Sequence, residues 1–443
     1  MKSSTSFVCS ECGYESPAFM GKCPECGTWN SLKEIKVPTF SQKNKQLESI
    51  NAKNLVPKKL REIHFEKKDR STTHFSEMDG VLGGGIVPGS VTLLAGDPGI
   101  GKSTLLLQLA LQFASIRGTN TSSVLYVSGE ESEQQIKLRA NRLDNTKNNN
   151  LLLISINNTD AIVDVIANIK PKLVVIDSIQ TMESGNLTGL SGSVGQVRYA
   201  AGEFIKLAKS LNIPIIIVGH VTKEGMVAGP MVLSHMVDTV LFLEGEKFTR
   251  VRILRCLKNR FGPVDEVGVF SMTDGGMHEV KNPESLFLSS GKLVSSGSVL
   301  TVTLEGSRPF LVEIQALTVF SKLPMPRRVG SGIDYRRLEL LIAVLQKHGR
   351  LPLDTMDIYV NVVGGLRLSD PGADLGICLA IFSSLKNIPI GKTVGIAEVG
   401  LLGELRMVSD FPKRVKEAKK LGFNNVIGAD KYESLSDVIK KLS

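Results

Sequence analysis

Aromatic residues are scarce in this chain, which has one tryptophan and six tyrosines among 443 residues. Stacking of many nucleic-acid bases on aromatic rings is therefore not obviously provided for. Apolar runs of about 18 residues, the length that lets a helix cross a bilayer, are absent. The first residues, MKSSTSFVCSECG, also lack the apolar core of a signal peptide. We therefore expect a cytoplasmic protein that contacts no membrane.

Cysteine is also rare, and four of the six cysteines lie between residues 9 and 26. The other two, Cys256 and Cys378, stand in apolar or strand-like surroundings, so we expect them to be buried and reduced. The apolar content of 42% and the charged content of 22% are typical of a globular protein, and the length favours two or three domains. The net charge of +9 favours a polyanionic partner, although solubility alone also explains it.

The early cysteines form two Cys-x2-Cys pairs, Cys9 with Cys12 and Cys23 with Cys26. Each pair places two thiolates on one tight turn, and two such turns complete a tetrahedral Zn²⁺ site. A module this small has no core of its own, so we expect the metal to supply its folding energy. Two disulfides are the alternative, which a cytoplasmic protein disfavours. Modules of this kind bind nucleic acid or protein, and this one is not especially basic.

The rest of the chain divides by composition. After residue 75, continuous apolar strands alternate with amphipathic helices, which predicts an α/β fold with a central, mainly parallel sheet. The expected strands are 90–96, 123–130, 171–178, 213–220, 236–245 and 250–259, and two of the expected helices are 103–117 and 197–212. The predicted boundaries are 1–30 for a zinc module, 31–74 for a basic linker, 75–271 for the α/β domain, 272–285 for a hinge and 286–443 for an α+β domain.

The strongest chemical motif is GDPGIGKST, residues 96–104, which fits G-x4-G-K-[ST] between a predicted strand and a predicted helix. In this pattern the glycines let backbone N–H groups surround phosphate, the lysine reaches the β and γ phosphates, and the hydroxyl meets Mg²⁺. A glycine-rich turn by chance is the alternative, which this context disfavours. We expect ATP and Mg²⁺ to bind to Gly96, Asp97, Gly99, Gly101, Lys102, Ser103 and Thr104.

Polar residues at the ends of other predicted strands complete a candidate catalytic site. Asp177 ends KLVVIDS, where a carboxylate would lie beside the phosphate loop and hold Mg²⁺. Glu130 and Glu131 follow VLYVSG, and a carboxylate there would face the γ-phosphate as a general base. We assign the base to Glu130, with exchanged roles as the alternative. His220 ends IIIVGH and is either a γ-phosphate sensor or a structural histidine.

A second group of charges lies downstream, in CLKNRFGPV, residues 256–264. A strand-like run, RVRILRCL, leads into it, so Lys258 and Arg260 occupy alternate positions and would point to one side. The positions alone also allow a solvated strand end or a contact with DNA phosphates.

The phosphate loop, SGEES, VVIDS, VGHVTK and above all KNRFG resemble the RadA/Sms family of bacterial recombination ATPases, over nearly the whole chain. The resemblance implies a RecA-like ATPase, close in style to DnaB helicases, that forms a homo-hexameric ring with nucleotide at subunit interfaces. Lys258 and Arg260 would then reach the γ-phosphate bound by the neighbouring subunit. Arginine supplied in trans can raise a hydrolysis rate by roughly 10³–10⁵-fold.

In RecA-like proteins, the segments that follow Asp177 and His220 form loops lining a central channel. Within these segments, Arg198 and Lys223 are candidate contacts to the DNA backbone. The family resemblance implies single-stranded and branched DNA as substrates and a RecA-type recombinase as a partner. It also implies translocation that drives branch migration in DNA repair and recombination.

The C-terminal part resembles the Lon protease domain, through VNVVGGLRLSDPGADLGICLAI and VGIAEVGLLGELRMVSDFPKRVKEAKKLGF. Lon proteases use a serine–lysine pair. Here Asp374 stands where the serine is expected, and Pro412, followed by Lys413, where the lysine is expected. We therefore expect no proteolysis and a scaffold for the ring. Basic residues in this part are candidate DNA contacts or a solvated face: Arg308, Lys322, Arg327, Arg328, Arg336, Arg337 and Lys347.

The function that follows is a DNA-dependent ATP hydrolase that acts as a ring motor. An ATP-regulated DNA-binding clamp or signalling ATPase without motor activity is the alternative. An ATP-dependent protease is disfavoured, because the expected serine nucleophile is missing.

Overall fold

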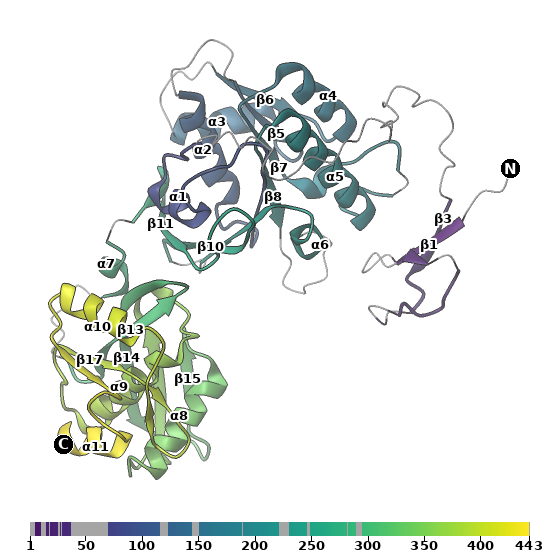
Figure 1. The fold of residues 1–443 in the computed structure, drawn as a ribbon. Coiled ribbons are helices and arrows are strands. Elements are labelled where there is room, and N and C mark those ends of the chain that lie inside the picture. Colours follow the sequence, from purple (N-terminus) through teal and green to yellow (C-terminus); the bar gives the residue numbers. More distant parts are fainter. Residues whose placement is uncertain are drawn as a thin grey trace, which may run out of the picture. The chain divides into compact units, whose positions relative to one another are not determined.

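The computed structural model comprises two compact units (Figure 1). The first contains Met1–Leu243, Cys256–Pro263 and Gly275–Met277, and the second contains Glu244–Arg255, Val264–Asp274 and His278–Ser443. Among the residues that the structure describes, no helix is both long and apolar enough to cross a membrane. The described residues are 5–9, 15–16, 18–24, 27, 29–36, 70–115, 123–143, 150–187, 189–220, 230–245, 249–280, 282–288 and 295–442.

The first residues form a three-stranded antiparallel sheet in the order β2-β1-β3. Its strands are β1 (Thr5–Cys9), β2 (Glu15–Ser16) and β3 (Leu32–Lys36). Cys9 and Cys23, each 1% exposed, pack together with Leu32. β3 lies inside the segment predicted as a linker, so its first residues form a strand; residues 37–69 of that segment lie outside the described residues.

A nine-stranded sheet forms the centre of the α/β part, in the order β12-β11-β10-β9-β4-β8-β7-β5-β6. The pairings among β4 to β9 are parallel, and β10 pairs antiparallel with β11. The predicted mainly parallel sheet is confirmed, as are its six expected strands. The strands are β4 (Val91–Gly96), β5 (Val124–Ser128), β6 (Leu151–Ser155), β7 (Leu173–Asp177), β8 (Ile215–His220), β9 (Thr239–Glu244), β10 (Val251–Asn259), β11 (Val267–Thr273) and β12 (Gly276–Glu279).

Helices cover this sheet because their apolar residues recur at helical spacing. In α5, Val197, Ala201, Phe204 and Ala208 fall on one stripe and pack with α4 against the strands. α2 packs on β4, β5 and β7, and its residues Leu105–Leu107 are fully buried. The helices are α1 (Ser76–Leu82), α2 (Lys102–Ser115), α3 (Glu133–Leu143), α4 (Thr159–Ile169), η3 (Ile179–Thr181), α5 (Val194–Leu211) and α6 (Pro230–Ser234).

The second unit is an α/β fold around a six-stranded mixed sheet in the order β15-β16-β14-β13-β17-β20. The strands are β13 (Ser298–Glu305), β14 (Arg308–Phe320), β15 (Arg328–Ser331), β16 (Met356–Val362), β17 (Thr393–Ile396) and β20 (Asn425–Gly428), with a separate pair β18 (Glu398–Val399) and β19 (Leu405–Arg406). The helices are α7 (Glu284–Phe287), η4 (Val363–Gly365), α8 (Tyr335–Lys347), η5 (Pro371–Ala373), α9 (Asp374–Lys386), α10 (Phe411–Lys420) and α11 (Leu435–Leu442). α9 is apolar over most of its length and is almost wholly buried.

The division between the units does not follow the predicted domain boundary at residue 271. Val251 and Ile253 of β10, with Val269 of β11, belong to the apolar core that also contains Phe310 and Val312. These strand residues therefore group with the second unit. The segment predicted as a hinge, 272–285, instead contains β12 and the start of α7.

A buried ion pair ties α10 to the sheet of the second unit. Arg414 is 1% exposed; it pairs with Asp370 and donates a hydrogen bond of 2.9 Å to the carbonyl oxygen of Val302. The carboxylate of Asp370 also accepts hydrogen bonds from the backbone N–H groups of Leu304, at 2.8 Å, and Gly372, at 2.9 Å. Burial raises the pKa of Asp370, but these hydrogen bonds outweigh burial, so the pKa lies below its ordinary value.

We predict that Arg414→Met destabilises the second unit by about 3–5 kcal/mol at neutral pH, because it leaves a buried carboxylate unpaired. Asp370 has a lower pKa in the native state than in the unfolded state, so its ionised form stabilises the native fold at pH values above the unfolded pKa. This stabilisation is lost as the pH falls through the native pKa. In the variant the carboxylate would take up a proton at higher pH. The difference between wild type and variant should therefore shrink as the pH falls from neutral through the ordinary carboxyl pKa of 3.8 toward the lower native pKa of Asp370.

Calorimetric unfolding of the full chain measures this difference. Arg406→Met is the matched control, because Arg406 is 58% exposed and pairs with Glu404 at the surface, where ion pairs contribute little. An equal effect of the two substitutions would contradict the prediction.

Candidate active site

The carboxyl ends of four neighbouring parallel strands bring the predicted site residues to one edge of the sheet. In the pairing of β4 with β8, Gly96 stands opposite His220, and in the pairing of β5 with β7, Ser128 stands opposite Asp177. β7 and β8 pair in the same direction. Ligands of open α/β sheets bind at this edge. The register therefore places the phosphate loop at the same edge of the sheet as both predicted acidic strand ends, with β8 between β4 and β7.

The phosphate loop connects β4 to α2. Gly96 has a φ of +152°, and a Cβ there would lie 2.3 Å from the carbonyl oxygen of Leu243, so only glycine fits. At the other end of the loop, α2 begins at Lys102, and the N–H groups and dipole of a helix N-terminus favour a phosphate. The remaining residues predicted to bind nucleotide lie on this loop and the first turn of α2: Asp97, Gly99, Gly101, Ser103 and Thr104.

The side chain of Lys102 lies back along the loop. Its Nζ donates hydrogen bonds to the carbonyl oxygens of Gly96, at 2.8 Å, and Asp97, at 2.9 Å. The residue is 3% exposed. Burial lowers the pKa of Lys102 to about 8, against the attraction of Asp177, Asp97 and Glu130. A phosphate oxygen is a stronger acceptor for an ammonium group than a carbonyl, so this buried cation is well suited to an anionic ligand.

Asp177 is fixed by a tyrosine of the neighbouring strand. The hydroxyl of Tyr126 donates a hydrogen bond of 2.5 Å to Oδ2 of Asp177. Both residues are buried, at 1% and 8% exposure. Burial, followed by the charge of Asp177, raises the pKa of Tyr126 well above its ordinary value, so its hydroxyl keeps its proton. One carboxylate oxygen is thus held in place at the end of β7.

The two adjacent glutamates after β5 contact different partners. Oε1 of Glu130 accepts a hydrogen bond of 2.6 Å from Oγ of Ser178 and lies 3.5 Å from Nε2 of His220. Glu131 instead forms an ion pair with Arg139 of α3. Glu130 therefore faces the ends of β7 and β8, whereas Glu131 holds α3. This arrangement supports the base at Glu130 over the exchanged roles.

The surroundings of His220 favour its neutral form. Burial lowers its pKa below the ordinary value, and the charge of Lys102 lowers it further, against the attraction of Glu130. Its Nδ1 is buried and has no hydrogen-bond partner among the described residues. A neutral imidazole donates at one nitrogen and accepts at the other, which fits the predicted sensor position.

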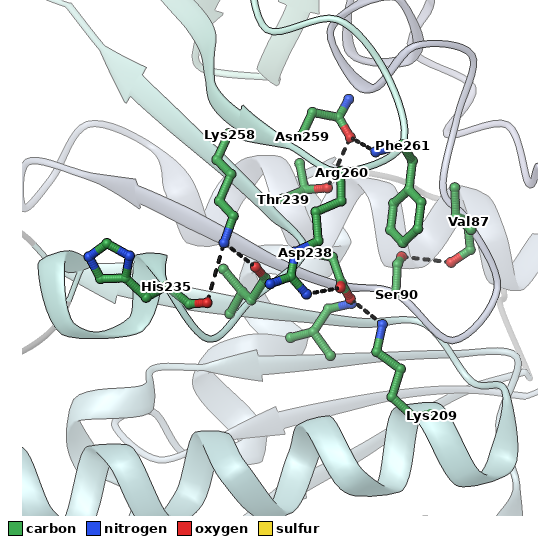
Figure 2. A network of polar contacts seen from close by, with 12 residues as sticks. Val87, Ser90, Lys209, His235, Asp238, Thr239, Lys258, Asn259, Arg260 and Phe261 are labelled. Atoms are coloured by element: carbon green, nitrogen blue, oxygen red, sulfur yellow. Dashed lines mark hydrogen bonds and ion pairs between the residues drawn. The ribbon is translucent and has the colours of Figure 1, made fainter.

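Figure 2 shows how the KNRFG motif is held within the chain. Nζ of Lys258 donates hydrogen bonds to the carbonyl oxygens of Ser234 at 2.7 Å, Val237 at 2.9 Å and His235 at 3.4 Å. Nη1 of Arg260 lies 3.2 Å from Oδ1 of Asp238. Both cations therefore contact residues 234–238, while the side chain of Arg260 is still 53% exposed. The role of the two cations stays a prediction.

The other residues of the motif fasten its turn to the start of the α/β part. Nδ2 of Asn259 donates to the carbonyl oxygen of Leu82, at 3.2 Å, and its Oδ1 accepts from the N–H of Phe261, at 3.0 Å. Nη2 of Arg70 donates to the carbonyl oxygen of Phe261, at 2.5 Å. The sequence KNRFG thus fixes a particular turn as well as presenting charge.

The remaining candidate DNA contacts and the expected position of the protease lysine lie in different surroundings. Arg198 lies on α5 and is exposed, whereas Lys223 lies outside the described residues. In the second unit, the side chain of Arg337 pairs with Asp374, which is 2% exposed and also accepts from the N–H of Val399. Nζ of Lys413 donates to the carbonyl oxygen of Ser307. Arg337 is therefore engaged inside its unit rather than free for DNA.

The structure describes four of the six cysteines. Cys256 and Cys378 are buried, as expected, and their thiols are free. Cys9 and Cys23, one from each Cys-x2-Cys pair, are buried in the same small cluster. Cys12 and Cys26 lie outside the described residues. Thiol donors from both pairs that converge in one cluster fit a zinc site.

The sequence did not predict three residues that contact the candidate site: Tyr126, Ser178 and Asp238. Tyr126 carried a usable signal, because a tyrosine inside a fully buried aliphatic strand needs a partner for its hydroxyl. Asp238 carried a similar signal, since an acid directly before an apolar strand needs compensation when it is buried. Ser178 carried no such signal, because serine is common after strands.

Comparisons with known proteins agree with this architecture. A family model described as an AAA domain matches residues 58–226, and one described as a rubredoxin metal binding domain matches residues 7–34. The DNA repair protein RadA of Halalkalibacterium halodurans is 45% identical over 431 residues, covering 97% of this chain and 93% of that protein. RadA of Bacillus subtilis is 46% identical over 428 residues, covering 96% and 92%. A crystal structure of the RadB recombinase covers 47% of this chain and 99% of its own, at 23% identity and a TM-score of 0.37.

The large sheet is mainly parallel and carries the phosphate loop at its edge, and the first residues match a metal-binding ribbon. These features define a RecA-like P-loop ATPase with an N-terminal zinc ribbon and an additional C-terminal α/β unit. The relatives extend over nearly the whole chain. The chain belongs to the RadA family of DNA repair proteins.

Proposed function

We propose that this chain is a DNA-dependent ATPase of DNA repair, whose nucleotide sites are shared between subunits of a ring. The observation that carries the proposal is the common edge at which Lys102, Asp177 and Glu130 meet. A lysine on a phosphate loop with a carboxylate at a neighbouring strand end is suited to ATP, and the second carboxylate is suited to a proton-transfer role. The role in DNA repair is carried over from the RadA relatives.

The residues of the loop would bind the triphosphate. Backbone N–H groups of residues 97–101 and the ammonium of Lys102 would hold the β and γ phosphates. The hydroxyl of Ser103 and the carboxylate of Asp177 are the groups that would hold Mg²⁺. When bound, Mg²⁺ would neutralise charge that develops on the phosphates. Tyr126 would keep Asp177 oriented toward the ion.

Glu130 would accept a proton from the water that attacks the γ-phosphate. Its hydrogen bond from Ser178 and its proximity to His220 hold the carboxylate at the strand ends. A group that is 48% exposed can meet water without leaving the site. His220 would report the presence of the γ-phosphate to the segment that follows it.

Lys258 and Arg260 would complete the pocket of the neighbouring subunit. In a single chain, Nζ of Lys258 is occupied by three carbonyl oxygens, whereas the side chain of Arg260 is 53% exposed. Arg260 is therefore the group more readily available to a neighbour. Its guanidinium would stabilise charge on the transferred phosphate.

The assembly and the DNA substrate rest on family similarity. We propose a homo-hexamer on single-stranded and branched DNA, in which ATP turnover drives movement and branch migration, with a RecA-type recombinase as a partner. Arg198, exposed on α5 after the loop that follows Asp177, would contact the DNA backbone.

The second unit would serve as a Lon-like scaffold without protease activity. Asp374 begins α9 at the position expected for the serine, and its carboxylate is held by Arg337. A carboxylate in this ion pair cannot form an acyl-enzyme. Casein digestion measures this, and any proteolysis that depends on Asp374 would contradict the proposal.

We predict that Cys9, Cys12, Cys23 and Cys26 bind one zinc ion. Cys23→Ser should abolish stoichiometric zinc and make the first 36 residues sensitive to trypsin, because the metal supplies the folding energy of a module without a core of its own. Metal analysis and limited proteolysis measure both effects. Cys256→Ser, a buried cysteine outside the module, is the matched control. Full zinc retention in Cys23→Ser would sink the assignment.

We predict that Glu130→Gln lowers kcat for ATP hydrolysis by about 10²–10⁴-fold while leaving nucleotide affinity nearly unchanged, since it removes a general base. Glu131→Gln removes the same charge one residue later and should have a much smaller effect, because Glu131 pairs with Arg139. Single-turnover kinetics and nucleotide titration separate the two parameters. The reverse ranking would exchange the roles of the two glutamates.

We predict that Lys102→Ala and Arg260→Ala, each inactive alone, restore DNA-stimulated hydrolysis when mixed. The first variant lacks the phosphate loop lysine but supplies Arg260, and the second holds ATP but lacks the arginine. Assay with single-stranded DNA at several mixing ratios measures the shared sites. As a control, Arg260→Ala mixed with the double variant Lys102→Ala, Arg260→Ala should stay inactive. No restoration at any ratio would refute the shared site.

A further inference from the structure

Asp238 is a buried carboxylate to which the proposed function gives no role, although it pairs with Arg260. Its side chain is 4% exposed, and it stands directly before β9. Oδ2 lies 2.5 Å from Nζ of Lys209 and accepts a hydrogen bond of 3.0 Å from the N–H of Val91. Oδ1 lies 3.2 Å from Nη1 of Arg260. A buried carboxylate requires such partners, and Figure 2 shows Lys209 of α5 and Arg260 of the KNRFG turn meeting at Asp238.

Backbone hydrogen bonds hold Asp238 from both sides. Its N–H donates to the carbonyl oxygen of Val91, at 3.0 Å, and its carbonyl oxygen accepts from the N–H of Arg260, at 3.1 Å. Val91 is the first residue of β4, which ends at Gly96 and the phosphate loop. The position of Arg260 is therefore set, through Asp238, relative to the strand that carries the nucleotide site of the same subunit.

The same short segment holds both cations of the motif. The carbonyl oxygens that accept from Lys258 belong to residues 234–237, immediately before Asp238. The ammonium of Lys258 has three donors and three carbonyl partners, so it is fully used. Arg260 has five N–H donors, and only its Nη1 pairs with Asp238. Its side chain is 53% exposed, so other donors can reach a further partner.

The charges around Asp238 leave a positive surplus. One carboxylate faces two cations, Lys209 and Arg260, so it orients the guanidinium without neutralising it. A planar guanidinium can bind one carboxylate through one edge and a phosphate through another. An arginine without an anchor samples many rotamers, and restricting them before the partner arrives removes an entropic cost of the encounter.

We propose that Asp238 is a positioning residue that orients Arg260 toward the phosphate of a nucleotide bound by the neighbouring subunit. This inference rests on the proposed shared site and adds the group that directs its arginine. Asp238 itself touches neither nucleotide, so its loss should act only through the subunit that donates the arginine.

Mixed rings test this directional effect. The donor subunit is Lys102→Ala, which supplies Arg260, and the acceptor subunit is Arg260→Ala, which holds ATP. Asp238→Asn in the donor should lower DNA-stimulated kcat of the mixture by about 10- to 100-fold, because a displaced catalytic group loses this much rate. The same substitution in the acceptor should cost much less, because that subunit has no Arg260 to orient.

Four outcomes decide between the explanations. An equal loss of hydrolysis with Asp238→Asn in either subunit would mean that Asp238 stabilises its own fold through Val91. No loss in either subunit would mean that Arg260 needs no anchor. Each of these results overturns the inference. Asymmetric loss supports it. If the parent mixture without Asp238→Asn fails to hydrolyse ATP, the shared site itself is refuted, and this inference with it.

Two further variants control the experiment. Glu203→Gln removes a carboxylate that pairs with Lys206 on α5, the helix that carries Lys209, and should leave the mixture unchanged in either placement. Asp238→Glu keeps the charge but shifts it by one methylene, so it tests the same asymmetry if Asp238→Asn does not fold. Circular dichroism and thermal unfolding of each subunit establish that folding is retained.

Discussion

The register of four parallel strands, β5, β7, β8 and β4, is the constraint on which the candidate site depends. With Gly96 level with His220 and Ser128 level with Asp177, the segments that follow all four strands start at one edge. A slip of one residue would turn the side chains of a strand to the opposite face of the sheet. The strands themselves are continuously apolar and buried on both faces. The polar residues that end or follow them, Asp177, His220 and Glu130, lie at the edge where the candidate site forms.

Buried charges in this chain mainly orient other groups. Besides Asp238, the pairs Arg414 with Asp370 and Arg337 with Asp374 each join elements far apart in sequence. Arg255 of β10 likewise lies 2.5 Å from Glu244 and 2.6 Å from Glu305. Such pairs gain little net stability after desolvation, but each fixes the angle of a side chain. The candidate active site is assembled from separate strands, so its side chains require orientation of this kind.

The sequence predicted the central strands of the large sheet and missed the strands at its two edges, β6 and β12. Central strands such as Leu173–Asp177 are uniformly apolar, whereas Leu151–Ser155 lies at the sheet edge, is only partly buried, and gave a weaker signal. β12 was missed because Gly276–Glu279 contains a glycine and polar residues that are also typical of loops. The acidic strand ends were predictable, since each follows an apolar run. The contacts of Lys258 were not, because its partners are backbone carbonyl oxygens, which leave no trace in residue identity.

The ion pair at the start of α9 has a consequence for how such a unit could change. Asp374→Ser would place a hydroxyl at the start of α9, but it would deprive the guanidinium of Arg337 of its acceptor and remove one for the N–H of Val399. The substitution would thus cost folding before it gained any chemistry. Because the carboxylate and the arginine depend on each other, a tolerated change at position 374 requires a second change at position 337.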